Sequence, residues 1–304
     1  MKSRVAWVLP ECRLNPQSSV VGYQNKAYEV NGGFTIGVST FDKVGDSKVS
    51  LKDLNVVGGT YADNAIQFLK NNGSTDTYTY TNDEYADIKD YYGNEIPQTV
   101  QKMLFYINED DAPGMECTPG WYMMADYDCI VNMSEKEDFD VKFGTGFFFK
   151  PFKTGVSLQY AGEVVQGDSE LDLPVNGGFT LTGNCSPVNF DLSNFSVVGG
   201  TYADNAIQFL KNNGSTDKYT YTDGEYADIK DYYGNEIPQT VQKMLFYINE
   251  NDAPGMECTP GWYMMADYDC IVNMSEKFMV KSGEGFFFKP FKTGVKLVVP
   301  SAIQ

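Results

Sequence analysis

The sequence predicts a mainly β protein built from two near-identical domains in tandem. Residues 56–136 recur at residues 197–277, an offset of 141, with four differences in 81 positions. Within each copy, short runs of β-branched and aromatic residues are separated by glycine, asparagine, aspartate and proline. Short strands with frequent turns are typical of β-sandwiches and jelly rolls. We therefore expect two tandem β-sandwich or jelly-roll-like domains, with short helices possible.

Flanking similarity sets the domain boundaries. The motif VNGGFT occurs at residues 30–35 and 175–180, and GFFFKPFKTGV ends at Val156 and again at Val295. The two repeats differ slightly in length between these motifs. Repeat two is four residues shorter in the segment that follows VNGGFT, and repeat one has two extra residues near Glu137 and Asp138. Surface loops accommodate such differences. The predicted organisation is an N-terminal extension over residues 1–19, domain 1 over residues 20–162 and domain 2 over residues 163–304.

Four segments of repeat one carry the clearest strand signals, because they are rich in β-branched or aromatic residues and are bounded by turn residues. They are Thr77–Thr81, Lys102–Asn108, Phe147–Phe152 and Val156–Tyr160. Two segments are also compatible with a helix: AIQFLK after Asp63, and QTVQKMLFYI after Pro97. Their aromatic content favours strands there as well.

Composition and charge exclude several classes of function. The 304 residues include 41 acidic and 23 basic side chains, for a net charge of −18, and no histidine. Without histidine there is no Ser-His-Asp or Cys-His pair and no histidine-ligated metal. An acidic chain is a poor partner for nucleic acid or anionic lipid. No apolar run approaches the roughly 18 residues of a membrane span. With no Walker loop or nucleophile elbow, we expect a non-enzyme without nucleic-acid partner or membrane insertion.

Four of the six cysteines recur at equivalent positions. Cys117 and Cys129 in repeat one correspond to Cys258 and Cys270 in repeat two, with eleven residues and a Pro-Gly turn between each pair. We expect a disulfide across each loop, worth roughly 3 kcal/mol in the chain-entropy model. Zinc would lack two ligands, and no C-x-x-C redox motif is present. Disulfides imply an oxidising, and hence extracellular or cell-surface, location.

The remaining cysteines, Cys12 and Cys185, have no counterparts, since Thr40 occupies the position equivalent to Cys185. We expect them to pair with each other, either within one chain or between chains. A pair between chains would join subunits head to tail, in a ring or a filament. Beside Cys12 lies a β-prone segment, too short for the apolar core of a signal peptide, which we expect either to add to a neighbouring subunit or to cap its own domain. The predicted subunit contact is Val5, Ala6, Trp7, Val8 and Leu9.

Two further features are candidate ligand sites. Trp121-Tyr122 and Trp262-Tyr263 follow Pro-Gly turns. They would form one sugar-stacking platform per repeat if exposed, although a Trp beside a disulfide more often belongs to the core. Acidic loops could supply oxygen ligands to calcium, but none has EF-hand spacing, and a solvated surface is the favoured interpretation. The calcium candidates are Asp110, Asp111, Asp126 and Asp128, and no other cofactor is expected.

The order of the repeated motifs resembles secreted bacterial tandem β-repeat surface proteins of unknown activity. The anchors are VVGY, NGGFTIGVSTF, AIQFL, PGWY and GTGFFFKPF, at residues 20–23, 31–41, 65–69, 119–122 and 144–152. Repeat two departs from this pattern at residues 166–168, where QGD replaces the first motif. The resemblance implies export and a surface role, and it supplies no catalytic residue.

These observations predict a non-enzymatic extracellular structural protein. It would assemble head to tail with itself, through its N-terminal strand, into a filament or surface coat. Two copies of one surface provide lattice contacts or avidity, which catalysis seldom needs. The alternative is a bivalent, adhesin-like module that binds a surface glycan or other ligand through the two Trp-Tyr pairs.

Overall fold

The structure is a computed structural model. It describes residues 21–28, 30, 33–39, 48–70, 74–90, 92–123, 131–163, 165, 167–211, 215–231, 233–264, 267 and 272–301. The predicted N-terminal strand over residues 5–9 and three of the six cysteines, Cys12, Cys129 and Cys270, lie outside these residues.

The chain is mainly β, as predicted, and its sheets are antiparallel. The strands of repeat one are β1 (Val21–Ala27), β2 (Thr35–Val38), β3 (Lys48–Val49), β4 (Leu54–Val57), β5 (Asn64–Gln67), β6 (Thr77–Thr79), β7 (Thr99–Gln101), β8 (Met103–Ile107), β9 (Gly120–Met123), β10 (Val141–Lys142), β11 (Gly146–Pro151) and β12 (Ser157–Glu163). Its helices are α1 (Asn82–Tyr85) and the 3-10 helices η1 (Leu51–Asp53), η2 (Tyr61–Asp63), η3 (Ala112–Met115) and η4 (Glu137–Phe139).

Repeat two contains the same series of elements in the same order, except that its described residues include no counterpart of η4. Its strands are β13 (Ser169–Leu171), β14 (Thr180–Gly183), β15 (Phe190–Asp191), β16 (Ser196–Val198), β17 (Asn205–Gln208), β18 (Lys218–Thr220), β19 (Thr240–Gln242), β20 (Met244–Ile248), β21 (Gly261–Met264), β22 (Met279–Val280), β23 (Gly285–Pro290) and β24 (Lys296–Val299). Its helices are α2 (Asp223–Tyr226), η5 (Leu192–Asn194), η6 (Tyr202–Asp204) and η7 (Ala253–Met256).

Each repeat builds its main core between two sheets. In repeat one the five-stranded sheet β2-β11-β5-β8-β9 and the three-stranded sheet β1-β12-β4 share one cluster of buried side chains. In repeat two the corresponding sheets are β14-β23-β17-β20-β21 and β13-β24-β16. Strand alternation explains the FFF motif: Phe147 and Phe149 are fully buried, whereas Phe148 points to the other face and is half-buried. The predicted sandwich-like fold is confirmed.

The segments compatible with either state are strands. AIQFLK contributes to β5, and QTVQKMLFYI contributes to β7 and β8. The short helix α1 begins after Thr81 instead, where a reciprocal cap forms. The Glu84 carboxylate accepts from the Thr81 N–H at 2.8 Å, and the Thr81 hydroxyl accepts from the Glu84 N–H at 3.4 Å. The local cap thus places the helix between β6 and β7.

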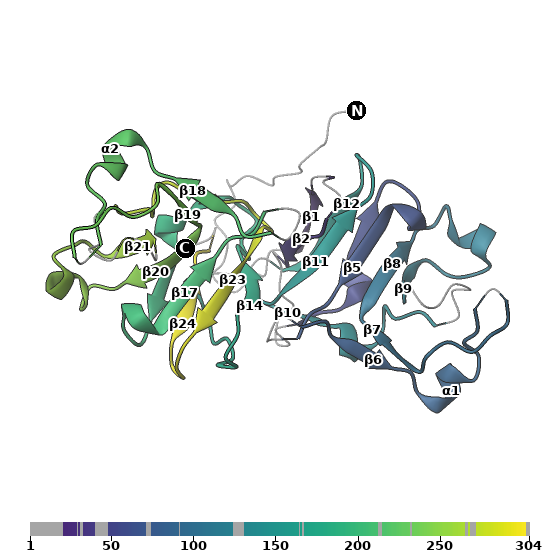
Figure 1. The fold of residues 1–304 in the computed structure, drawn as a ribbon. Helices are drawn as coiled ribbons and strands as arrows, with labels where there is room; N and C mark the ends of the chain where they lie inside the picture. The colour runs from purple at the N-terminus through teal and green to yellow at the C-terminus, as the bar shows by residue number, and fades with distance from the viewer. Residues whose placement is uncertain are drawn as a thin grey trace.

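The two domains pack against each other through equivalent faces. Strand β2 contacts both β14 and β23, and β11 contacts β14. The helices α1 and α2 lie at opposite ends of the molecule (Figure 1). A Cβ atom on Gly146 would lie 2.9 Å from Cβ of Leu181. A Cβ on Gly285, the counterpart of Gly146, would press on Ile36, the counterpart of Leu181. The same contact is therefore made twice, which gives the interface approximate twofold symmetry.

One hydrogen-bond chain breaks this symmetry. The Tyr28 hydroxyl donates to the Gly283 carbonyl across the interface at 3.1 Å. It lies 2.6 Å from the Tyr160 hydroxyl, which therefore acts as the donor to Tyr28. Burial raises the pKa of both tyrosines, so both remain protonated at neutral pH. Domain 2 has Leu173 and Val299 at the equivalent positions, so this link exists once in the described residues.

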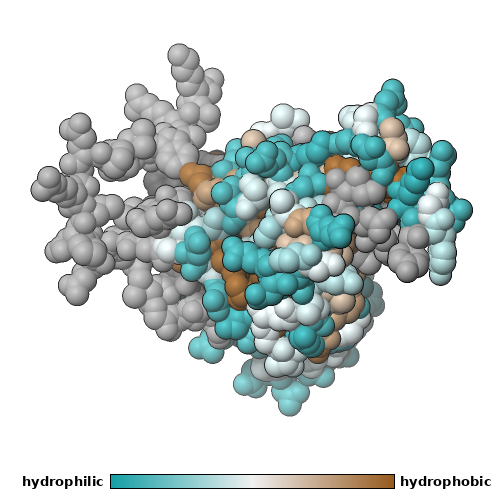
Figure 2. All heavy atoms as spheres, turned by 90° about the vertical axis from the view of Figure 1, so that its left-hand side faces the viewer, coloured by the Kyte–Doolittle hydropathy of each residue, from teal (hydrophilic) through white to brown (hydrophobic). Residues whose placement is uncertain are grey.

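The outer surface of domain 2 is mostly polar. Figure 2 faces this domain; hydrophilic and intermediate side chains cover most of the coloured surface, with small separate hydrophobic areas. This pattern suits a chain with a net charge of −18.

Candidate functional site

The Trp-Tyr pairs do not form a surface platform. Trp121, Tyr122, Trp262 and Tyr263 are all at most 2% exposed. Successive residues of β9 point to opposite faces of the sheet, so Trp121 enters the main core and Tyr122 enters a second cluster beside η3. The Trp121 indole N–H donates to the Leu54 carbonyl at 2.5 Å. The prediction of a sugar-stacking platform is therefore wrong and the alternative, that each Trp belongs to the core, is confirmed, because both faces of the sheet are covered.

The predicted disulfide loops are described only in part. Cys117 and Cys258 are both half-buried. Their expected partners, Cys129 and Cys270, lie outside the described residues. No disulfide joins two of the cysteines that the structure describes, and both loop bridges stay predictions.

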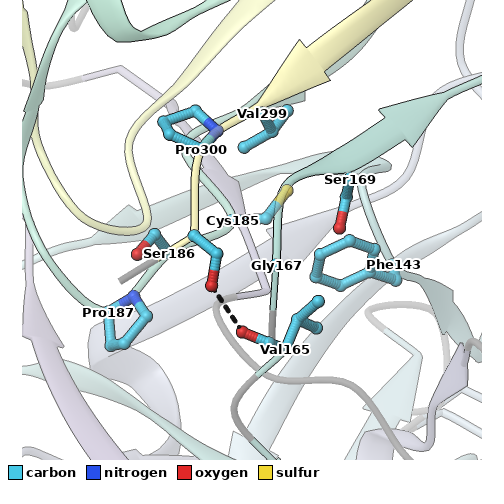
Figure 3. Close-up of a pocket in the computed structure, with 10 residues that line it drawn as sticks. Phe143, Val165, Gly167, Ser169, Cys185, Ser186, Pro187, Val299 and Pro300 are labelled. Atoms are coloured by element: carbon cyan, nitrogen blue, oxygen red, sulfur yellow. Dashed lines mark hydrogen bonds between the residues drawn. The ribbon is translucent and has the colours of Figure 1, made fainter. Parts of the chain in front are cut away.

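Cys185 lines a small crevice at the boundary between the domains (Figure 3). Its side chain is 3% exposed, and Phe143 of domain 1 lines the same crevice. Val165, in the segment that connects the domains, also lines it, and its carbonyl accepts a 2.7 Å hydrogen bond from the Ser301 hydroxyl. The crevice therefore lies where domain 1, the connecting segment and the end of domain 2 meet.

The N-terminal extension leaves domain 1 near this boundary. Val21 pairs with Glu163 at the end of β12, two residues before Val165. Cys12 lies nine residues before Val21 in the sequence, and an extended chain of that length spans about 30 Å. Both a contact within the chain and an exchanged contact with a neighbour are thus sterically reasonable for Cys12 and Cys185.

The calcium candidates gain no support from their surroundings. One carboxylate oxygen of Asp111 accepts from the Tyr61 N–H at 2.8 Å. Asp126 and Asp128 lie outside the described residues, but Asp267, the counterpart of Asp126, is fully buried and accepts from the Val272 N–H at 2.7 Å. The described residues contain no group of three or more metal-ligating side chains. Asp111 and Asp267 thus hold loops in place.

Ion pairs at equivalent positions hold surface segments of both domains. Lys153 lies 2.6 Å from Asp63, and Lys292 lies 2.7 Å from Asp204. The pKa of each aspartate is lowered to about 2 by the lysine partner and by hydrogen bonds from the threonine three residues earlier, Thr60 or Thr201. These pairs link η2 and η6 to the ends of β11 and β23.

A groove of about 450 Å³ lies in domain 1 beside the Pro-Gly turn that precedes Trp121. No local sequence pattern predicts this groove. The groove runs between η1 and β4 on one side and the segments around β9 on the other. Its polar lining residues include Lys52, Asn55, Tyr106, Thr118, Asn132 and Glu135.

Tyr106 is held firmly in this groove. Its half-buried ring packs against Trp121 with the ring centroids 5.2 Å apart. Its hydroxyl donates to Oδ1 of Asn55 at 3.1 Å. Burial, aided by the nearby Glu109 carboxylate, raises the pKa of Tyr106. The ring and its hydroxyl therefore have a fixed position and a fixed protonation state.

The opposite rim of the groove is equally well ordered. The Asn132 side-chain amide donates to the Thr118 hydroxyl at 3.2 Å and to the Pro119 carbonyl at 3.3 Å, and its Oδ1 accepts from the Ser134 N–H at 2.9 Å. Gly120 has a φ of 153°, and a Cβ there would lie 2.5 Å from Nδ2 of Asn132. This close approach explains the glycine of the PGWY motif.

Domain 2 keeps most of the residues that line the groove but changes those of one wall. Tyr247 packs against Trp262 with centroids 5.1 Å apart, as in domain 1. Lys52 and Asn55, however, are replaced by Ser193 and Ser196. Both differences lie just before residue 56, where the near-identity of the repeats begins. An alignment of the two repeats that continued upstream of residue 56 would have shown them.

Comparison with known proteins found no match: no protein-family model, curated protein or solved structure is similar to this chain. The resemblance to secreted tandem-repeat proteins stays a prediction. Among the described segments, no helix has the length and apolar character required to cross a bilayer.

Proposed function

We propose that the protein is a non-enzymatic extracellular structural protein that assembles head to tail with itself into a filament or surface coat. The observation that carries the proposal is the symmetric contact of β2 and β11 with β14 and β23. A contact between two equivalent faces occupies both of them, so these faces are not available to bind the next subunit of an assembly. Growth then requires elements that occur once in the chain.

The chain offers two such elements. One is the N-terminal extension with its predicted strand, Val5–Leu9, and Cys12. The other is the crevice around Cys185. The cysteine occurs once, because Thr40 occupies the position equivalent to Cys185 in repeat one. A contact between one element of each kind joins different surfaces of successive subunits, which is the geometry of a filament.

The sheet beside the crevice has an edge for an added strand. Strand β13 is the outer strand of the sheet β13-β24-β16 and is only three residues long, and no described strand pairs with its other side. Its first residue, Ser169, lines the Cys185 crevice. A β-prone segment added at this edge would bring the adjacent Cys12 toward Cys185.

The proposed extracellular setting follows from the same cysteines. A bridge between Cys12 and Cys185 and the two expected loop bridges require an oxidising compartment. The acidic, mostly hydrophilic surface suits a protein exposed to solvent.

Non-reducing electrophoresis and intact mass spectrometry of Cys12→Ser test the proposed joint. The unreduced wild type should form a ladder of disulfide-linked oligomers that reduction converts to the 33.9 kDa chain, and Cys12→Ser should abolish the ladder. Cys117→Ser is the matched control and should keep it. A wild-type monomer in which Cys12 and Cys185 are joined within one chain would contradict the proposal.

A further inference from the structure

We infer that the groove beside Tyr106 in domain 1 binds a neutral glycan, one per chain. The inference does not depend on head-to-tail assembly, and the site differs from the buried Trp-Tyr pairs. It rests on a set of polar groups that the fold positions in the groove but does not use.

Three side chains supply these unused groups. The Lys52 ammonium and the Glu135 carboxylate are exposed and have no hydrogen bond or ion pair within the described structure. Asn55 accepts from Tyr106 through Oδ1, which holds its side chain in place, while its Nδ2 has no hydrogen-bond partner among the described residues. The groove thus offers donors from Lys52 and Asn55 and acceptors from Glu135, around a fixed aromatic ring.

This combination identifies the chemistry of the ligand. A hydroxyl group both donates and accepts, so several hydroxyls on one ligand satisfy donors and acceptors that lie together. The half-buried Tyr106 ring provides an apolar surface for the C–H groups of such a ligand, and ligand sites commonly combine an aromatic surface with a few positioned polar groups. A sugar chain has both kinds of group.

Charge argues against ionic ligands. Lys52 is the one cationic side chain among the described residues of the groove, and Glu135 lies in the same groove, so an anion meets attraction and repulsion together. A cation meets the reverse combination. The glycan is therefore neutral.

The second domain supplies the argument for a single site. At the equivalent positions it keeps Tyr247 but has Ser193 and Ser196 in place of Lys52 and Asn55. A serine hydroxyl is attached directly to Cβ and does not reach as far as a lysine ammonium or an asparagine amide. Domain 2 therefore lacks the donors on which the domain 1 site depends.

The first experiment probes an array of neutral and acidic oligosaccharides with the full-length chain and then titrates a bound neutral oligosaccharide by calorimetry. We expect binding to neutral members and one ligand per chain. The double variant Lys52→Ser, Asn55→Ser should weaken binding by about tenfold or more, since two hydrogen bonds, one of them to a charged group, are lost. It should keep the wild-type melting temperature, because domain 2 already accommodates serine at both positions.

The reciprocal variant Ser193→Lys, Ser196→Asn should create a second site and raise the stoichiometry to two. Ser196→Ala is the matched control in domain 2 and should bind as the wild type does. Absence of binding to every neutral oligosaccharide would overturn the inference. So would two ligands per wild-type chain, or unchanged affinity in a folded Lys52→Ser, Asn55→Ser variant.

Discussion

Domains 1 and 2 share their interior and differ in their first strands. From residues 56 and 197 onward, four differences separate 81 aligned positions, and the main-core Trp occupies the same place in both. Its indole N–H donates to the Leu54 carbonyl in domain 1 and to the Phe195 carbonyl in domain 2. Before that point the domains diverge, and there lie Tyr28, Asn55 and Cys185. Shared residues therefore maintain the fold, while the divergent first part of each domain holds the features that occur once.

The largest expected effect tests the shared interior. Trp121→Ala and Trp262→Ala should each destabilise their own domain by about 3–5 kcal/mol, because each removes a fully buried ring. Chemical denaturation followed by tyrosine and tryptophan fluorescence measures both changes. The exposed Tyr92→Ala variant is the control and should shift stability by less than about 0.5 kcal/mol. A domain that tolerates the Trp substitution would break the equivalence of the two cores.

The next effect concerns the symmetric interface. Gly146→Ala and Gly285→Ala should each cost about 1–3 kcal/mol, because the added Cβ overlaps Leu181 or Ile36 of the other domain. Small-angle scattering should show a longer particle if the faces separate. Gly224→Ala has open space around its Cβ and should leave stability and shape unchanged. Two variants with very different effects would contradict the twofold contact.

Tyr28→Phe should sharpen the asymmetry between the domains. The substitution removes the hydroxyl that links Tyr160 to the Gly283 carbonyl, at an expected cost of about 0.5–1.5 kcal/mol. Hydrogen exchange should then increase at β2 and β23 but not at β9 or β21. Tyr92→Phe, at an exposed position, is the matched control. Unchanged exchange at the interface would show that the hydroxyl chain does not hold the domains together.

The smallest expected effects are the changes in stability when the pH is lowered. Asp63, Asp204 and Glu225 have pKa values of about 2 in the folded protein, against ordinary values of 3.8 for Asp and 4.5 for Glu. The lysine partners are the main cause of the lowered pKa of the two aspartates. For Glu225, burial raises the pKa, but the hydrogen bonds from Lys277 and Thr222 lower it by more. Since the folded state holds these carboxylates ionised, their stabilisation is complete above the ordinary values and is lost as the pH falls toward 2.

Melting temperatures measured between pH 6 and pH 2 check this expectation. Asp63→Asn and Asp204→Asn should flatten the acid dependence by similar amounts, because the two ion pairs are equivalent. A decrease in stability confined to one of the two variants would contradict that equivalence.

Local patterns in the sequence predicted much of the fold. The alternating FFFKPF and KMLFYIN segments gave the correct strands, because one face of each strand enters the core. The two segments that were also compatible with a helix are strands, as their aromatic content predicted, whereas the helix α1, signalled by the Thr81 and Glu84 capping spacing, was not predicted. Burial of Tyr122 was missed because it depends on η3 covering the second face of the sheet.

Tertiary contacts account for the rest. No local pattern shows that Gly146 faces Leu181, since that contact depends on how the two domains meet. The groove likewise combines Asn55 with Tyr106, which lie 51 residues apart and are brought together by sheet order. Such sites need the folded arrangement of several strands before they can be recognised.

Electron microscopy of the purified, unreduced protein at several concentrations tests the central claim most directly. Head-to-tail assembly predicts filaments or sheets that lengthen with concentration, with an axial repeat one two-domain subunit long, and that Cys12→Ser shortens or abolishes. Isolated two-lobed particles at every concentration, identical in wild type and Cys12→Ser, would contradict it.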